Sequence, residues 1–323
     1  MNALRIGFST ILYLIAGSVM AQAYPVTVEH KYGSTTLSEA PERIVTIGFN
    51  EQDAVYAVGF APVAVRYWFA DDDALYPWSE VAADGTEPEV LNMTELNMET
   101  ILNLDPDLII AQYSGITNAE YKQLSQIAPT LAQSGDYVDY GMPWQEMTID
   151  IGTALGRADE AEAQVAEVEA AFEEARAEHP EFEGKSILVL LPNIEGGFYA
   201  YRSDENRSRA FTNLGFTVPE EIDALAGEAF YISVSQERYD LLERDVLVLI
   251  ATEETPEQAR ALVEGDPLFS QLEVVKDDRV VYVVQERAQA LGFNTVLSLP
   301  YALEGFLPDL SEAVARVEPA QAN

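Results

Sequence analysis

Seven short runs of apolar residues, rich in β-branched side chains, alternate along the chain with segments of helical periodicity. Each run is apolar at nearly every position, whereas a strand with one solvated face alternates polar and apolar residues. Such strands need helices on both faces of their sheet, as parallel sheets have. The pattern therefore predicts an α/β protein with largely parallel sheets. The expected strands are residues 43–48, 63–69, 107–113, 128–133, 186–192, 245–252 and 279–284.

One long helix is expected between the fourth and fifth strands, from Asp159 to Glu178. Asp159 and Glu162 have the spacing of a capping box at its start. About 20 residues at about 1.5 Å each reach roughly 30 Å, enough to run along two lobes. An ordinary surface helix has the same pattern, but the position between two sets of strands favours a connector. Its apolar residues recur at spacings of three and four and are Ala161, Val165, Val168, Phe172 and Ala175.

A repeated unit supports two similar lobes. Glu99 is followed by a short helical segment and then by Asp107, which opens an apolar strand, and Glu237 and Asp245 show the same pattern at the same spacing. We expect an N-terminal lobe over residues 24–157, a backbone helix over 158–180 and a C-terminal lobe over 181–323.

Glu99 and Glu237 occupy matching positions in this repeat, each two residues after a candidate helix cap, Asn97 or Ser235. The helix dipole favours an acid in the first turn by about 0.3–1 kcal/mol, which is sufficient reason for either glutamate alone. A matched acid on each of two lobes also offers two docking points for a partner with two-fold symmetry.

The first residues indicate an export signal. Arg5 is followed by an apolar run from Ile6 to Met20 and by Ala21-Gln22-Ala23, a small-residue pattern of the kind that signal peptidase recognises. A membrane anchor is the alternative, but the run is shorter than the about 20 apolar residues that a spanning helix needs. We therefore expect residues 1–23 to be removed as a signal peptide by cleavage after Ala23. The chain has no cysteine, so no lipid anchor is expected.

Composition argues against several classes of function. The 18 basic and 55 acidic residues give a formal net charge of −37, which disfavours nucleic acid and anionic membranes as partners. His30 and His179 are the two histidines, and without cysteine they offer no zinc or manganese cage. Motifs of nucleotide binding and of serine hydrolases are missing. We therefore expect a binding protein rather than an enzyme, with no cofactor.

Three arginines cluster in a chain that has few cations: Arg202, Arg207 and Arg209. Ser208 is the expected cap of the helix that follows. The arginines therefore lie near the start of this helix, where the helix dipole disfavours positive charge. Such a local inconsistency often marks a functional site. Arginine is also the preferred partner of anionic oxygens. The alternative is that these arginines pair with the neighbouring Asp204 and Glu205.

Aromatic residues stand near the ends of expected strands, where parallel sheets bind ligands. We expect Trp68, Tyr113 and Tyr231 to form walls of the site, although most aromatic residues belong to the core. Arg66 and Arg287 are expected as further ligand contacts, and either is also explained as an ordinary surface cation.

The chain resembles the periplasmic binding proteins of siderophore, haem and cobalamin importers, the class with a helical backbone. The resemblance covers nearly the whole mature chain. Its segments are residues 41–45, 50–51, 57–59 and, most specifically, 97–110. The similarity is closest to the iron–siderophore members, through residues 113–115, 137–140, 143–145 and 207–209.

The resemblance implies a ligand cleft between two lobes joined by one long helix, with Tyr140 as a further ligand contact. It implies capture of a ferric siderophore in the periplasm and delivery to the inner-membrane permease dimer of an ABC importer. Glu99 and Glu237 match the two surface glutamates with which the family binds permease arginines.

The same resemblance bears on the ligand and on the cell compartment. The missing lipidated cysteine implies a free periplasmic protein, and a monomer is expected. The clustered arginines favour an anionic chelator, of catecholate or citrate type, over a neutral hydroxamate. Haem and cobalamin stay open as alternatives within the family.

Overall fold

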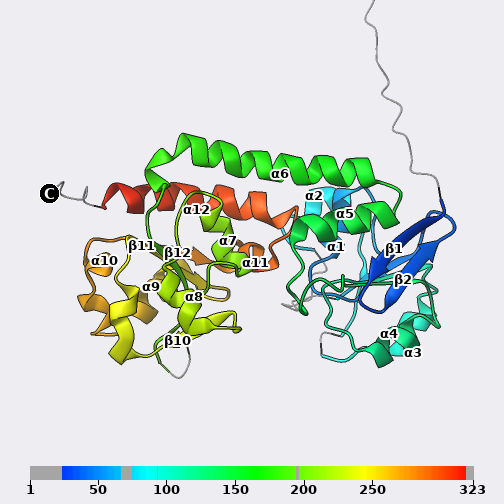
Figure 1. The fold of residues 1–323 in the computed structure, drawn as a ribbon, viewed down its shortest axis with the longest axis horizontal. Helices are drawn as coiled ribbons and strands as arrows, with labels where there is room; N and C mark the ends of the chain where they lie inside the picture. Colours follow the sequence, from blue (N-terminus) through cyan, green and yellow to red (C-terminus); the bar gives the residue numbers. More distant parts are fainter. Residues whose placement is uncertain (1–23, 67–74, 93, 194–195, 318–323) are drawn as a thin grey trace, which may run out of the picture.

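The computed structural model describes residues 24–66, 75–92, 94–193 and 196–317. In this part of the chain, one five-stranded sheet precedes helix α6 (Ala158–Glu178) and another follows it. A separate hairpin pairs β1 (Val26–His30) with β2 (Gly33–Leu37). The two sheets form two α/β lobes, and α6 runs along both of them (Figure 1). The expected fold class is therefore confirmed.

The N-terminal sheet has the strand order β5-β4-β3-β6-β7, and every neighbouring pair is parallel. Each of the first four expected runs contains one of its strands, because these residues are buried on both faces. The strands are β3 (Ile44–Thr46), β4 (Ala64–Val65), β5 (Glu89–Val90), β6 (Leu108–Ala111) and β7 (Thr130–Ala132). The helices of this lobe are α1 (Gln52–Ala57), α2 (Glu80–Ala83), α3 (Met98–Asn103), α4 (Asn118–Leu124) and α5 (Trp144–Ala154).

The C-terminal sheet is mixed, with the order β10-β9-β8-β11-β12. The three strands expected from sequence are parallel: β8 (Ile187–Pro192), β11 (Val246–Ala251) and β12 (Val280–Val284). Two further strands, β9 (Phe198–Tyr201) and β10 (Tyr231–Val234), add to the edge of β8 in antiparallel orientation. Exposed and buried residues alternate along β10, so it lacks the fully apolar pattern by which the other strands are recognised.

Short helices connect the strands of the C-terminal lobe, and one long helix ends the lobe. The α-helices are α7 (Asn206–Thr212), α8 (Glu220–Ala226), α9 (Pro256–Glu264), α10 (Glu273–Lys276), α11 (Gln285–Phe293) and α12 (Ser298–Ala315). Three 3₁₀ segments complete the described chain: η1 (Pro180–Phe182), η2 (Gln236–Leu242) and η3 (Phe269–Gln271).

Helix α6 is anchored in the cores of both lobes. All five residues of its expected apolar stripe are buried. Ala161 packs in the core of the N-terminal lobe, whereas Phe172 and Ala175 pack in the core that contains β8 and β11. Gly152 permits the close contact with α5, because a Cβ there would lie 2.3 Å from the Cβ of Ala161. The helix is therefore held at both ends.

The expected capping box of α6 is wrong. The helix begins one residue earlier, after Arg157, so Asp159 lies inside the first turn and no side chain caps the start. Arg157 instead pairs with Glu160, with 2.9 Å between Nη1 and Oε1. The exact lobe boundaries at residues 157 and 181 stay a prediction.

Candidate ligand-binding cleft

A cleft with a volume of about 410 Å³ lies between the lobes. Six of the nine residues expected to contact ligand line it: Tyr113, Tyr140, Arg202, Arg207, Arg209 and Tyr231. Its other lining residues are Val138, Gly141, Tyr201, Asp204, Glu205, Asn206, Glu228 and Phe230. The topology thus brings together the two halves of the predicted site, which belong to different lobes and are far apart in the sequence.

Aromatic side chains form walls on both sides of the cleft. In the N-terminal lobe the rings of Tyr113 and Tyr140 meet edge to face, with their centroids 5.4 Å apart. In the C-terminal lobe Tyr231 pairs with Tyr201 across the strands β10 and β9. Val138, Phe230 and Tyr231 are 70%, 50% and 43% exposed, which is unusual for large apolar side chains. The cleft thus offers apolar surface to a ligand from both lobes.

Two of the three cleft arginines have carboxylate partners. Arg202 pairs with Asp204 at 2.5 Å and donates to the carbonyl of Gly227 at 2.6 Å. Arg207 pairs with Glu205 at 2.6 Å and lies over the ring of Tyr201. Burial opposes the charge of Arg207 most strongly, but Glu205, Tyr201 and Tyr113 together raise the pKa of the guanidinium. The pairing alternative is therefore realised for Arg202 and Arg207.

The expected cap of α7 is wrong. Because the helix begins at Asn206, Ser208 lies inside it and not at its cap position. The side chain of Ser208 is fully buried. Glu205 is the cap, and its carboxylate accepts a hydrogen bond of 2.8 Å from the backbone N–H of Arg207. Asn206 is a cleft residue that sequence analysis does not identify, and its place within the arginine cluster is the only sequence signal for it.

A buried acid holds Tyr113 in place. The carboxylate of Glu51 accepts hydrogen bonds from the backbone N–H groups of Tyr113 at 2.7 Å and Gly48 at 2.8 Å. Burial raises the pKa of Glu51 to about 7, although these hydrogen bonds oppose the shift. Burial also raises the pKa of Tyr113 to about 12, so its phenol stays protonated at neutral pH. Tyr113 therefore presents a neutral hydroxyl to the cleft.

Arg66 lies beside the cleft and not in its lining. Its guanidinium packs 4.4 Å from the ring centroid of Phe49, and its Nη1 donates to the carbonyl of Ile47 at 3.2 Å. Phe49 in turn contacts Tyr140, with ring centroids 6.2 Å apart. Burial lowers the pKa of Arg66, and the nearby Tyr140 and Glu51 oppose this effect. The structure thus connects Arg66 to the cleft through Phe49 and Tyr140.

Arg287 lies away from the cleft lining, and its role as a ligand contact stays a prediction. This side chain packs between α11 and α12, with its guanidinium 3.6 Å from the ring centroid of Tyr301 and hydrogen-bonded to the carbonyl of the same residue. It is not among the residues that line the cleft. The remaining predicted wall residue, Trp68, lies outside the described residues.

Glu99 and Glu237 are both exposed, at the starts of α3 and η2. Asn97 caps α3 as expected, since its side chain accepts from the backbone N–H groups of Glu99 and Thr100. Ser235 makes no such hydrogen bond, and η2 is a kinked 3₁₀ segment rather than an α-helix. Helix α3 and strand β10, which precedes η2 in the chain, both lie on the side of the lobes away from α6 (Figure 1).

The lobes also contact each other directly through buried hydrogen bonds. The carboxylate of Asp53 in α1 accepts from Thr295 Oγ1 and from Trp78 Nε1. Asn50 Nδ2 donates to the carbonyl of Phe293 at 2.8 Å. Burial raises the pKa of Asp53 to about 7. The bonds to Thr295 and Phe293 fix the N-terminal lobe against the end of α11 and the segment that follows it, whereas Trp78 belongs to the N-terminal lobe itself.

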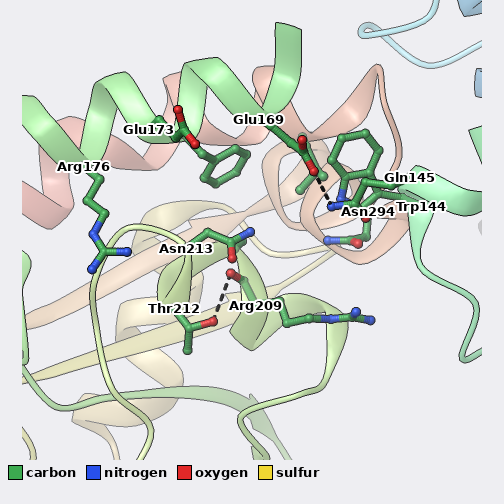
Figure 2. A pocket seen from close by; sticks show the side chains of 12 residues that line it. Trp144, Gln145, Glu169, Glu173, Arg176, Arg209, Thr212, Asn213 and Asn294 are labelled. Atoms are coloured by element: carbon green, nitrogen blue, oxygen red, sulfur yellow. Dashed lines mark hydrogen bonds between the residues drawn. The ribbon is translucent and has the colours of Figure 1, made fainter. Parts of the chain in front are cut away.

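A second pocket, of about 450 Å³, lies between α6 and α7 (Figure 2). Two of its charged groups have partners: Glu169 accepts from Gln145 at 3.2 Å, and Arg176 pairs with Glu183 at 2.6 Å. Arg209 lines this pocket as well as the cleft. Helix α7 therefore forms the wall between the two cavities.

Two kinds of site are absent from the part of the chain that the structure describes. Among the described residues, no three histidine, aspartate or glutamate side chains are placed to hold a metal ion. No helix there is long and apolar enough to cross a membrane.

Known proteins resemble the chain in sequence and in structure. The family model described as periplasmic binding protein matches residues 45–286. The Fe(3+)-citrate-binding protein YfmC of Bacillus subtilis is 29% identical over 257 residues, which are 78% of this chain and 76% of YfmC.

Two solved structures extend this similarity. A periplasmic solute binding protein from Mycobacterium smegmatis superposes with a TM-score of 0.79 at 33% identity, covering 90% of this chain and 98% of that one. PiaA of Streptococcus pneumoniae in complex with ferrichrome superposes with a TM-score of 0.74 at 27% identity, covering 91% and 100%.

Proposed function

The chain belongs to the periplasmic binding protein family, and we propose that it captures a ferric siderophore or ferric citrate between its lobes for an ABC importer. The observation that carries this proposal is one cleft with tyrosines from both lobes and three arginines from the C-terminal lobe. Aromatic rings suit the apolar frame of a chelator, while guanidinium and phenol groups donate to its oxygens. Relatives named for binding Fe(3+)-citrate and ferrichrome support the same class of ligand.

Delivery would use the side of the lobes away from α6. We propose that Glu99 and Glu237 dock a monomer of this protein onto the two halves of a permease dimer. Their exposure, their matching places in the repeat and the position of α3 and β10 on one side of the lobes support this role. Charges at the rim of an interface govern orientation and association rate more than the stability of the free protein.

We also propose that the protein works in the periplasm, free of a lipid anchor, after cleavage following Ala23. Membership of the family supports an extracytoplasmic site of action. The export signal itself lies in residues 1–23, outside the described residues.

A fluorescence titration tests the proposed ligand class. Trp144 lies at the second pocket, next to the wall formed by α7, and its emission should report ligand binding at this place. Ferric citrate, a ferric catecholate and a ferric hydroxamate would each be titrated, with haem and cobalamin as competitors. One-to-one quenching by a ferric chelate is expected. Binding of haem or cobalamin alone would contradict the proposal, and chemical turnover of the chelate would indicate an enzyme.

A further inference from the structure

The cleft arginines differ in how they are neutralised. Arg202 and Arg207 each form an ion pair with a carboxylate from the same turn. Arg209 forms no ion pair with any described residue. Its Nη2 donates to the neutral amide oxygen of Asn206, and its Nε–H has no acceptor within the described ranges. Arg209 thus keeps a positive charge that no neighbouring carboxylate cancels.

The acids of α6 do not supply the missing partner. Figure 2 shows the side chain of Arg209 extending away from the carboxylates of Glu169 and Glu173. Glu169 is instead hydrogen-bonded to Gln145. The guanidinium of Arg209 is therefore available to a ligand in the cleft, which Arg209 lines.

Asn206 holds this arrangement across the lobe boundary. Its Nδ2 donates to the phenol oxygen of Tyr113 at 3.4 Å, and its backbone carbonyl accepts from Asn294 at 3.1 Å. Because the phenol of Tyr113 stays protonated, both side chains next to Arg209 in this chain of hydrogen bonds are neutral. An acid in place of Asn206 would give Arg209 the same paired state as Arg202 and Arg207.

We propose that Arg209, positioned by Asn206, selects the ligand by charge. The guanidinium binds an anionic oxygen, a carboxylate or a deprotonated catechol, at the edge of a ferric chelate. Arg202 and Arg207 are already engaged with their carboxylates and shape the wall of the cleft. The inference rests on the proposed function and adds that the preferred chelate carries negative charge.

The sharpest test is Asn206→Asp, which replaces the amide NH2 group by a carboxylate oxygen and keeps the shape of the side chain. The new carboxylate can accept from both Arg209 and Tyr113, and an acid in the first turn of α7 suits the helix dipole. Titration with ferric dicitrate and with a neutral ferric trihydroxamate should separate charge from shape. We expect the dissociation constant to rise about 10- to 100-fold for the anionic chelate and by less than about threefold for the neutral one.

A second variant, Arg209→Gln, should give the same selective loss. Its matched control is Arg260→Gln on α9, which lowers the net charge by the same amount at a site that does not line the cleft. The control should leave the ratio of the two dissociation constants unchanged.

Three results would overturn the inference. Equal losses of affinity for both chelates in the Asn206→Asp and Arg209→Gln variants would show that neither residue distinguishes ligands by their charge. A preference of the unmodified protein for the neutral chelate would contradict the assigned role of Arg209. Failure of the unmodified protein to bind any ferric chelate would instead refute the proposed function, and the inference with it.

Discussion

Replacing Asp53 by asparagine should remove a large part of the pH dependence of folding stability. Burial raises the pKa of this carboxyl from its ordinary value of 3.8 to about 7, against the opposing hydrogen bonds from Thr295 and Trp78. A shift of about three pH units corresponds to about 4 kcal/mol, at about 1.4 kcal/mol per unit. Asparagine keeps an oxygen acceptor for both donors and cannot ionise.

The sign follows from the preference of the folded state for the protonated carboxyl. The stabilisation from Asp53 is complete below pH 3.8 and is lost as the pH rises to about 7. Between these values the folded protein binds more protons than the unfolded chain, so the free energy of unfolding falls as the pH rises. The Asp53→Asn variant lacks this contribution.

Urea unfolding at a series of pH values from 4 to 8 measures the effect. The difference in free energy of unfolding between the unmodified protein and the variant should change by about 4 kcal/mol across this range. The many other acids contribute equally to both proteins, so this difference isolates Asp53. Parallel stability curves would refute the reasoning, because they would show that Asp53 ionises as readily in the folded state as in the unfolded chain.

Three further predictions follow from the described contacts. The double variant Glu99→Ala with Glu237→Ala should bind chelate normally and lose most uptake in reconstituted vesicles, since truncating a docked charge costs about 2–5 kcal/mol; normal uptake would reduce both to helix-start acids. Gly48→Ala should lower the free energy of unfolding by about 1–3 kcal/mol, because its Cβ would lie 2.0 Å from Glu51 Oε2; an unchanged melting temperature would contradict this. Arg287→Gln should leave the dissociation constant of the chelate within about twofold of that of the unmodified protein. A tenfold rise would show that Arg287 contacts the ligand after all.

The fold was predictable where burial leaves a local pattern. The strands buried on both faces are continuous apolar runs, and the stripe of α6 has helical spacing, so each is visible in a short window of sequence. Strand β5 consists of Glu89 and Val90, both exposed, and carries no such signal. Strand β10 alternates along its length and adds to β9 only through long-range pairing.

The site was predictable in its composition and less so in its contacts. Arg207 and Arg209 are equivalent in sequence, yet one pairs with Glu205 and the other with Asn206. Arg287 has the sequence context of an exposed cation, but the packing of α12 against α11 places Tyr301 over it. Such differences depend on tertiary contacts, which local patterns do not encode.

Iron anomalous diffraction from crystals grown with ferric dicitrate tests the central claim most directly. The account predicts one iron per chain, inside a chelate that contacts Tyr113 and Tyr140 on one side and Arg209 and Tyr231 on the other. An iron bound elsewhere on the protein, or a cleft that stays without iron while the protein binds the chelate in solution, would contradict the account.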